Sequence, residues 1–165
     1  MNTNKYPVSK NQEMELEIEK LAFGGKGLTR LDEYVIFVGR TLPGDRVKAR
    51  IVKRRPNYAE AKLLEIIKSS PLRITAPCPY FGECGGCTWQ NLSYTDQLKF
   101  KKEHVRESLK QLAGIEDYEI KYPVPAEPVW GYRNKMEFSF SDRRWFTAEE
   151  KALENKDDQY VLGLH

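Results

Sequence analysis

The sequence predicts a mostly β protein with some helix: a small β-barrel, then a cysteine-rich loop, a helix and the beginning of an α+β domain. Three observations support this fold class. Short alternating stretches separated by turn residues fill the first 69 positions, three cysteines lie within ten residues, and a capped amphipathic stretch begins near Ser93. At 165 residues the chain has room for one domain or two small ones.

The first elements are read from alternation and turns. Residues 1–12 are polar and are expected to be a disordered tail. Residues 13–19 alternate glutamates with Met14, Leu16 and Ile18, which predicts a half-buried strand. The glycines of residues 23–27 indicate a loop, and the apolar run 34–38 predicts the next strand.

Two further strands follow in the predicted barrel. A Pro-Gly turn at residues 42–45 precedes residues 46–55, where apolar and basic side chains alternate, and Tyr58 to Ile67 reads as another strand. Short strands at this spacing favour a five-stranded, mostly antiparallel barrel of the OB type over residues 13–69.

The basic side of residues 46–55 is a candidate RNA-binding line, since it would place a row of cations against phosphates. No acidic residue occurs between Arg46 and Ala59, whereas a merely solvated strand face, the alternative, usually mixes charges. Two aromatic residues offer stacking surfaces, and a lysine lies in the glycine loop. The candidates are Phe23, Lys26, Arg46, Lys48, Arg50, Lys53, Arg54, Arg55 and Tyr58.

Charge is unevenly distributed along the chain. Residues 1–70 carry 14 Lys/Arg against 9 Asp/Glu, and residues 71–165 carry 13 against 15. A polyanion-binding surface is therefore expected in the N-terminal half. No stretch approaches the roughly 20 apolar residues of a membrane span, and no apolar signal core follows Met1, so we expect a cytoplasmic monomer with no membrane partner.

The C-terminal half is expected to contain the cysteine loop over residues 70–92 and the start of a central α/β domain over residues 93–165. Ser93 as N-cap and Gly114 as terminator bracket a helix. We expect one face of that helix to be apolar, formed by Tyr94, Leu98, Val105, Leu109 and Leu112, and its lysines (Lys99, Lys101 and Lys102) to be solvated. After the helix we expect a strand over residues 134–141, with Met136, Phe138 and Phe140 inward. A loop over 147–158 and a returning strand over 159–165 are expected to follow. Arg133 and Lys135 either bind phosphate or cover the strand over 134–141.

Cys78, Cys84 and Cys87 have the spacing Cys-x5-Cys-Gly-Gly-Cys. The odd count argues against a disulfide framework, and close spacing argues against unrelated buried thiols. Zinc and an iron–sulfur cluster each need four ligands, and only His104 and His165 remain as further imidazoles, neither well placed. The residues alone do not decide between zinc and an iron–sulfur cluster. For either metal centre, the chain lacks one of the four ligands.

Together these segments resemble the TRAM-containing RNA uracil-5-methyltransferases. The glycine loop and the Leu-Pro-Gly-Asp turn resemble a TRAM domain, the cysteine stretch with its following Thr-Trp-Gln resembles the family's cluster motif, and residues 131–136, Gly-Tyr-Arg-Asn-Lys-Met, resemble the entry into its central sheet. The resemblance covers about residues 13–165.

The resemblance implies a SAM-dependent enzyme that methylates C5 of uridine in RNA, with ribosomal RNA favoured over tRNA, and a 4Fe–4S cluster held by Cys78, Cys84, Cys87 and a fourth cysteine. The chain shows no nucleophile–base pair, and the fourth cysteine and the S-adenosylmethionine domain are expected beyond His165. We therefore expect the N-terminal part of such an enzyme, inactive alone, with a labile cluster. The alternatives are a free-standing RNA-binding module with a zinc or cluster staple, and a ferredoxin-type redox carrier, which the basic strand disfavours.

Overall fold

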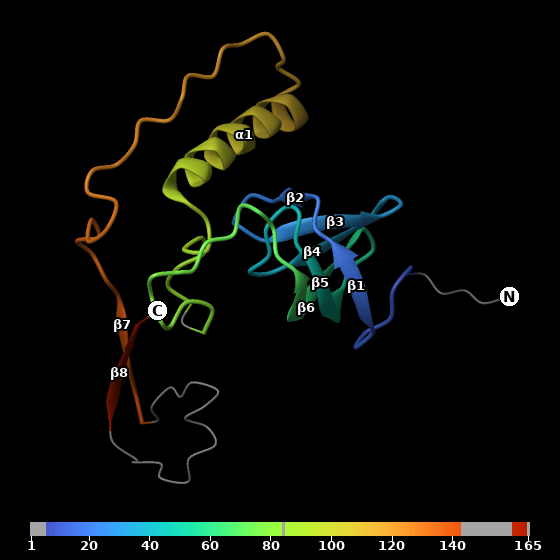
Figure 1. The fold of residues 1–165 in the computed structure, drawn as a ribbon, viewed down its shortest axis with the longest axis horizontal. Coiled ribbons are helices and arrows are strands. Elements are labelled where there is room, and N and C mark those ends of the chain that lie inside the picture. The colour runs from blue at the N-terminus through green and yellow to red at the C-terminus, as the bar shows by residue number, and fades with distance from the viewer. Residues whose placement is uncertain (1–5, 84, 143–159, 165) are drawn as a thin grey trace, which may run out of the picture. The chain divides into compact units, whose positions relative to one another are not determined.

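The computed structural model describes residues 6–83, 85–142 and 160–164, and the chain divides into two compact units (Figure 1). The first unit comprises residues 1–77 and 88–125, and the second comprises residues 78–87 and 126–165. Each unit is described by itself.

The first unit is built on a six-stranded sheet with the order β1-β5-β6-β4-β3-β2 (Figure 1). Neighbouring strands are antiparallel except β4 and β6, which are parallel. The strands are β1 (Glu13–Glu17), β2 (Lys20–Leu21), β3 (Gly27–Leu31), β4 (Tyr34–Val38), β5 (Arg46–Arg54) and β6 (Tyr58–Lys68).

The predicted five-stranded closed barrel is therefore corrected in two respects. The sheet has six strands, and in the described part of the chain its pairing order ends at β1 and β2 rather than closing. Those two edges are consecutive in sequence: the Ile18 amide donates to the Asp45 carbonyl at 2.9 Å, and the Glu19 amide donates to the Leu28 carbonyl at 2.9 Å. One short stretch of chain thus passes from one edge of the sheet to the other.

Sequence analysis missed the two-residue β2 and, with more consequence, β3. Its alternation is concealed because one inward position is the polar Thr29, which is 5% exposed, and another is a glycine. Thr29 is tolerated inside because its hydroxyl donates to a Glu19 carboxylate oxygen at 3.0 Å. A buried polar group whose partner lies ten residues away in the sequence leaves no trace in the hydrophobic pattern.

The main core lies on one face of this sheet. Alternate residues of β1, β4 and β5, among them Leu16, Ile36 and Ile51, are almost completely buried. Each such aliphatic side chain contributes roughly 1.5–3 kcal/mol by leaving water. Val8 belongs to the same cluster and is 1% exposed, so the expected loose tail does not extend to residue 8.

A turn, a strap and a helix add a second, smaller core. Leu21, Leu42 and Leu92 are buried together, and Leu72, Trp89 and Phe100 pack against them. The strap, defined as residues 70–77 and 88–93, therefore packs as part of the first unit.

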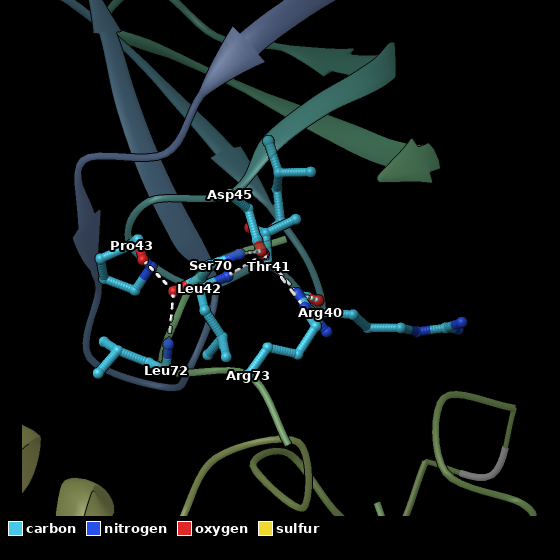
Figure 2. Close-up of polar contacts among 9 residues, drawn as sticks. Arg40, Thr41, Leu42, Pro43, Asp45, Ser70, Leu72 and Arg73 are labelled. Carbon is cyan, nitrogen blue, oxygen red and sulfur yellow. Dashed lines mark hydrogen bonds and ion pairs between the residues drawn. The ribbon is translucent and has the colours of Figure 1, made fainter. Parts of the chain in front are cut away.

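A buried carboxylate fixes the strap to the sheet (Figure 2). Asp45 is fully buried, and its side chain accepts hydrogen bonds from the amides of Leu42 and Ser70, both at 2.7 Å, and pairs with the Arg73 guanidinium. Ser70 in turn donates its hydroxyl to the Pro43 carbonyl at 2.6 Å. The junction between the predicted barrel and the predicted cysteine loop is thus held at Ser70 by buried polar contacts.

The helix α1 (Tyr94–Ala113) begins and ends as predicted. The Ser93 hydroxyl accepts the Asp96 amide at 3.1 Å, and Gly114 adopts the left-handed conformation at φ 66°. Its expected apolar face is only partly buried, since Leu98 is buried but Leu112 is 87% exposed. The other buried residue of the helix is His104.

The second unit contains a two-stranded antiparallel ribbon of β7 (Phe138–Ser141) and β8 (Val161–Leu164). The returning strand is confirmed, but the strand expected from Asn134 begins only at Phe138. Met136, Phe138 and Phe140, all predicted inward, are 48%, 50% and 84% exposed. The loop predicted over 147–158 lies outside the described residues. Within the described part, no helix has the length and apolar character to cross a membrane.

Candidate nucleic-acid interface

The basic face of β5 is lined by acidic residues from the neighbouring strand. Arg46 pairs with Glu15 at 2.6 Å, and Lys48 and Arg50 both pair with Glu13, at 3.0 and 2.6 Å. Arg50 first and Lys48 second hold the pKa of the Glu13 carboxyl below its ordinary value. Sequence reasoning overlooked these carboxylates because β1 lies about 30 residues earlier in the chain. A phosphate would have to compete with them.

The next cations along the chain are also paired. Lys26 and Lys53 both approach Glu60, at 2.7 and 3.1 Å, and these two ammonium groups, Lys26 first, lower the pKa of the Glu60 carboxyl. The glycine loop and the end of β5 are thereby bridged by one carboxylate of β6. These contacts are partly exposed, so each stabilises the fold by about 1 kcal/mol or less.

The last predicted residues of the basic line differ from one another. Arg54 donates to the Val8 carbonyl at 3.2 Å and lies over the Tyr6 ring, 4.9 Å from its centroid. Arg55 is exposed, and its side chain has no ion-pair partner among the described residues. The Tyr58 ring is half-buried edge-on against Phe37, at 5.7 Å between centroids, so only part of it is available for stacking. Arg55 is therefore an exposed cation of this line that no described carboxylate engages.

A pocket of about 570 Å³ lies between the glycine loop, the strap and α1 within the first unit. Phe23 and Gly24 contribute from the loop, Trp89 from the strap, and Lys101 and His104 from the helix. Phe23 is 87% exposed although it is a large apolar side chain. This hollow was not foreseen from the sequence.

The loop and the strap fit closely at Gly25. Its φ is +85°, and a Cβ on this residue would collide with the indole ring of Trp89. Only glycine combines that backbone conformation with such an approach. The glycine loop, which the sequence predicted only as a loop, therefore also serves as a packing surface for Trp89.

His104 joins the helix to β2. Its Nε2 lies 2.7 Å from the Leu21 carbonyl oxygen, and its ring lies 6.1 Å from Phe23 and 5.8 Å from Trp89 between centroids. The sequence placed this histidine on the helix that begins near Ser93, but it is six residues from Leu98 and so does not share that residue's helical face. Helical periodicity therefore gave no signal of its burial. Lys101, expected to be merely solvated, lines the same pocket.

The second unit contains the remaining candidates. Arg133 and Lys135 are exposed, and Lys135 pairs with Glu137 at 2.9 Å. Cys78 is half-buried and Cys87 is exposed, while Cys84 lies outside the described residues. Among the residues that the structure describes, no three His, Cys, Asp or Glu side chains are grouped to hold a metal ion. The cysteine centre stays a prediction from sequence.

Comparison with known families matches residues 7–64 to the TRAM domain. These residues form a TRAM domain. Their bounds contain the entire six-stranded sheet except the end of β6, and include the buried Val8. The family match thus assigns the barrel-like segment, which alternation and turns predicted over residues 13–69, to the TRAM domain.

Beyond the TRAM domain, the chain is homologous to RNA methyltransferases. An uncharacterised RNA methyltransferase of Halalkalibacterium halodurans is 36% identical over 87% of this chain and 31% of its own length. Another, from Caldanaerobacter subterraneus subsp. tengcongensis, is 40% identical over 96% of this chain and 32% of its own length. The crystal structure of Pyrococcus abyssi tRNA (uracil-54, C5)-methyltransferase with S-adenosyl-L-homocysteine matches at 34% identity and a TM-score of 0.43, covering 62% of this chain and 22% of that one. The chain spans about a third of the length of the curated relatives it matches.

Proposed function

We propose that this chain is the RNA-recognition part of an enzyme that transfers a methyl group from S-adenosylmethionine to C5 of uridine in RNA, with ribosomal RNA as the favoured substrate. The observation that carries the proposal is homology to RNA methyltransferases over nearly the whole chain, with a TRAM domain at residues 7–64. The resemblance of the cysteine stretch and of residues 131–136 to uracil-5-methyltransferases supports uridine C5 as the target.

The surface of the first unit supports RNA contact in specific places. Arg55 and Lys101 are exposed cations with no ion-pair partner in the described part of the chain, whereas Arg46, Lys48 and Arg50 are each bound to a glutamate. A cation without a competing carboxylate binds phosphate at lower cost. We therefore place the main phosphate contacts at the unpaired cations.

The methyl-transfer step itself is not assigned to residues of this chain. We propose that the 165 residues alone bind RNA and do not methylate it, because they span about a third of the relatives' length. The cysteines are proposed to hold a 4Fe–4S cluster in the second unit. The described residues bring no three potential ligand side chains together, so this cluster is proposed from the cysteine motif alone.

The test measures binding of a fluorescein-labelled octameric oligouridylate to the chain by fluorescence anisotropy, over a series of salt concentrations. We expect saturable binding whose log Kd rises with log salt by about 0.7 for each phosphate contact on a single strand. Arg55→Gln should weaken binding and lower this slope, and the matched variant Arg46→Gln should change both less, because Arg46 is engaged by Glu15 at 2.6 Å.

Two results would contradict the proposal. Absence of binding at the lowest salt concentration would refute RNA recognition by this chain. Incorporation of labelled methyl groups into ribosomal RNA by the purified chain would refute the proposal that these 165 residues bind RNA without methylating it. RNA binding by a gene product that has no methyltransferase segment would instead favour the free-standing RNA-binding module.

A further inference from the structure

The pocket beside α1 has walls suited to a flat aromatic ring. Phe23, Trp89 and His104 surround it, and the Phe23–His104 pair is close to T-shaped, with an interplanar angle of 67°. The Phe23 ring is 87% exposed, so most of its surface is available to a ligand. Stacking on such rings does not depend on base sequence, because every base has a π face.

The polar groups of the pocket match a nucleotide. The Leu21 carbonyl can only accept, so Nε2 of His104 must carry the proton of that 2.7 Å hydrogen bond. In the neutral ring, Nδ1 is then an acceptor, and it has no partner among the described residues. The hydroxyls of Thr88 and Ser108 add groups that both donate and accept. An imino or amino group of a base would find an acceptor here.

The charge of the pocket indicates which group the ligand carries beside its aromatic ring. Lys101 is the cation in its lining, no Asp or Glu lines it, and within the described chain Lys101 makes no ion pair. Phosphate is the natural complement of such an ammonium. The volume, about 570 Å³, lies within the range of pockets that bind small molecules and accommodates one or two nucleosides.

The structure assigns this pocket as a binding site for an unpaired nucleobase of single-stranded RNA, stacked on Phe23, with its phosphate beside Lys101. The inference rests on the proposed RNA-binding function and specifies where one base is held. A protein segment is the less suitable occupant, because an apolar helix would leave the ammonium and the imidazole acceptor without partners.

The test compares Phe23→Ala with Leu112→Ala in the full 165-residue chain. The two residues are equally exposed, at 87%, but Leu112 lies outside the pocket. Binding of the labelled octameric oligouridylate should weaken about tenfold or more in Phe23→Ala, with an unchanged salt slope, because stacking is not ionic. Leu112→Ala should bind like the wild type. Lys101→Gln should lower the salt slope by about 0.7.

A second probe distinguishes the base from its backbone. An abasic octamer, which keeps sugars and phosphates, should bind the wild type and Phe23→Ala equally. If wild type binds the oligouridylate and Phe23→Ala binds it as well, the base pocket is wrong and RNA recognition stands. If Phe23→Ala weakens binding of the abasic strand as much as binding of the oligouridylate, the contact is with the backbone, and the assignment is overturned. Failure of the wild type to bind RNA removes both proposals. A wild-type dimer that Phe23→Ala converts to monomer in sedimentation would show that a second copy of the chain occupies the pocket.

Discussion

Replacing Asp45 by asparagine should destabilise the first unit far more than any change on the charged strand face. The carboxylate is fully buried and receives the Leu42 and Ser70 amides, both at 2.7 Å, together with the Arg73 guanidinium. The asparagine amide has the same shape, but its NH₂ group would face a donor. At least one of the three interactions is then lost, and the Arg73 charge is left without its partner.

The magnitude follows from burial. Removing one partner of a buried ion pair costs about 3–5 kcal/mol, and the Arg73 side chain is 18% exposed, so it retains some water and the lower end applies. We expect a loss of about 3 kcal/mol in the free energy of unfolding. With a urea m-value of about 1.5–2 kcal/mol/M, the midpoint should fall by about 1.5–2 M.

The assay is urea unfolding followed by far-UV circular dichroism, with hydrogen exchange at the Leu42 and Ser70 amides as a local readout. Glu15→Gln is the matched control, since it also neutralises a carboxylate paired with an arginine. That pair is more than half exposed on both sides, so its loss should cost below about 1 kcal/mol. Equal midpoint shifts in the two variants would refute the reasoning that the buried carboxylate ties the strap to the sheet.

Three other outcomes are expected. Gly25→Ala should weaken oligouridylate binding and lower the urea midpoint, because the new methyl group meets the Trp89 indole and the φ of +85° is strained for alanine; an unchanged midpoint and affinity would contradict this packing. Arg50 and Lys48 lower the pKa of Glu13, so the contribution of this carboxylate to stability is present above the unfolded-state pKa of about 4.5 and is lost as pH falls through the folded-state pKa. Glu13→Gln should therefore reduce the decline of the urea midpoint below about pH 5. A decline identical to that of the wild type would count against these ion pairs. Anaerobically purified chain should contain iron and sulfide near four each if the three cysteines suffice for a cubane cluster; zinc would favour the stapled RNA-binding module, and absence of metal would show that the fourth ligand is required.

Local patterns predicted the strands and caps well, for identifiable reasons. The strands β4, β5 and β6 each bury alternate residues against one core, so their period of two is visible in the chain. The caps of α1 are set by Ser93 and Gly114, whose conformational and hydrogen-bonding preferences act within a few residues. In both cases the decisive interaction is nearby or repeats regularly.

Long-range pairing explains what the sequence concealed. Glu13 and Glu15 neutralise the basic line only because β1 lies beside β5, and His104 is buried only because α1 packs near Leu21. Likewise, Leu112 follows the helical period of the apolar face yet is 87% exposed, because periodicity identifies a face but not the length over which it is covered. A sequence pattern therefore predicts which groups exist more reliably than which groups remain available for a ligand.

The pocket and the buried carboxylate depend on the same strap. Trp89 packs on the cluster that contains Leu42, and its carbonyl accepts a hydrogen bond from the Gln97 side chain of α1 at 3.0 Å. Asp45 holds the turn at Leu42 and the strap at Ser70. The wall on which a base would rest is thus fixed by a turn of the TRAM domain and by a helix that lies outside the matched residues 7–64. A TRAM sheet expressed without residues 88–113 would keep Phe23 but lose the indole, imidazole and ammonium groups of the pocket. The proposed base-binding site therefore needs the strap and α1 as well as the sheet.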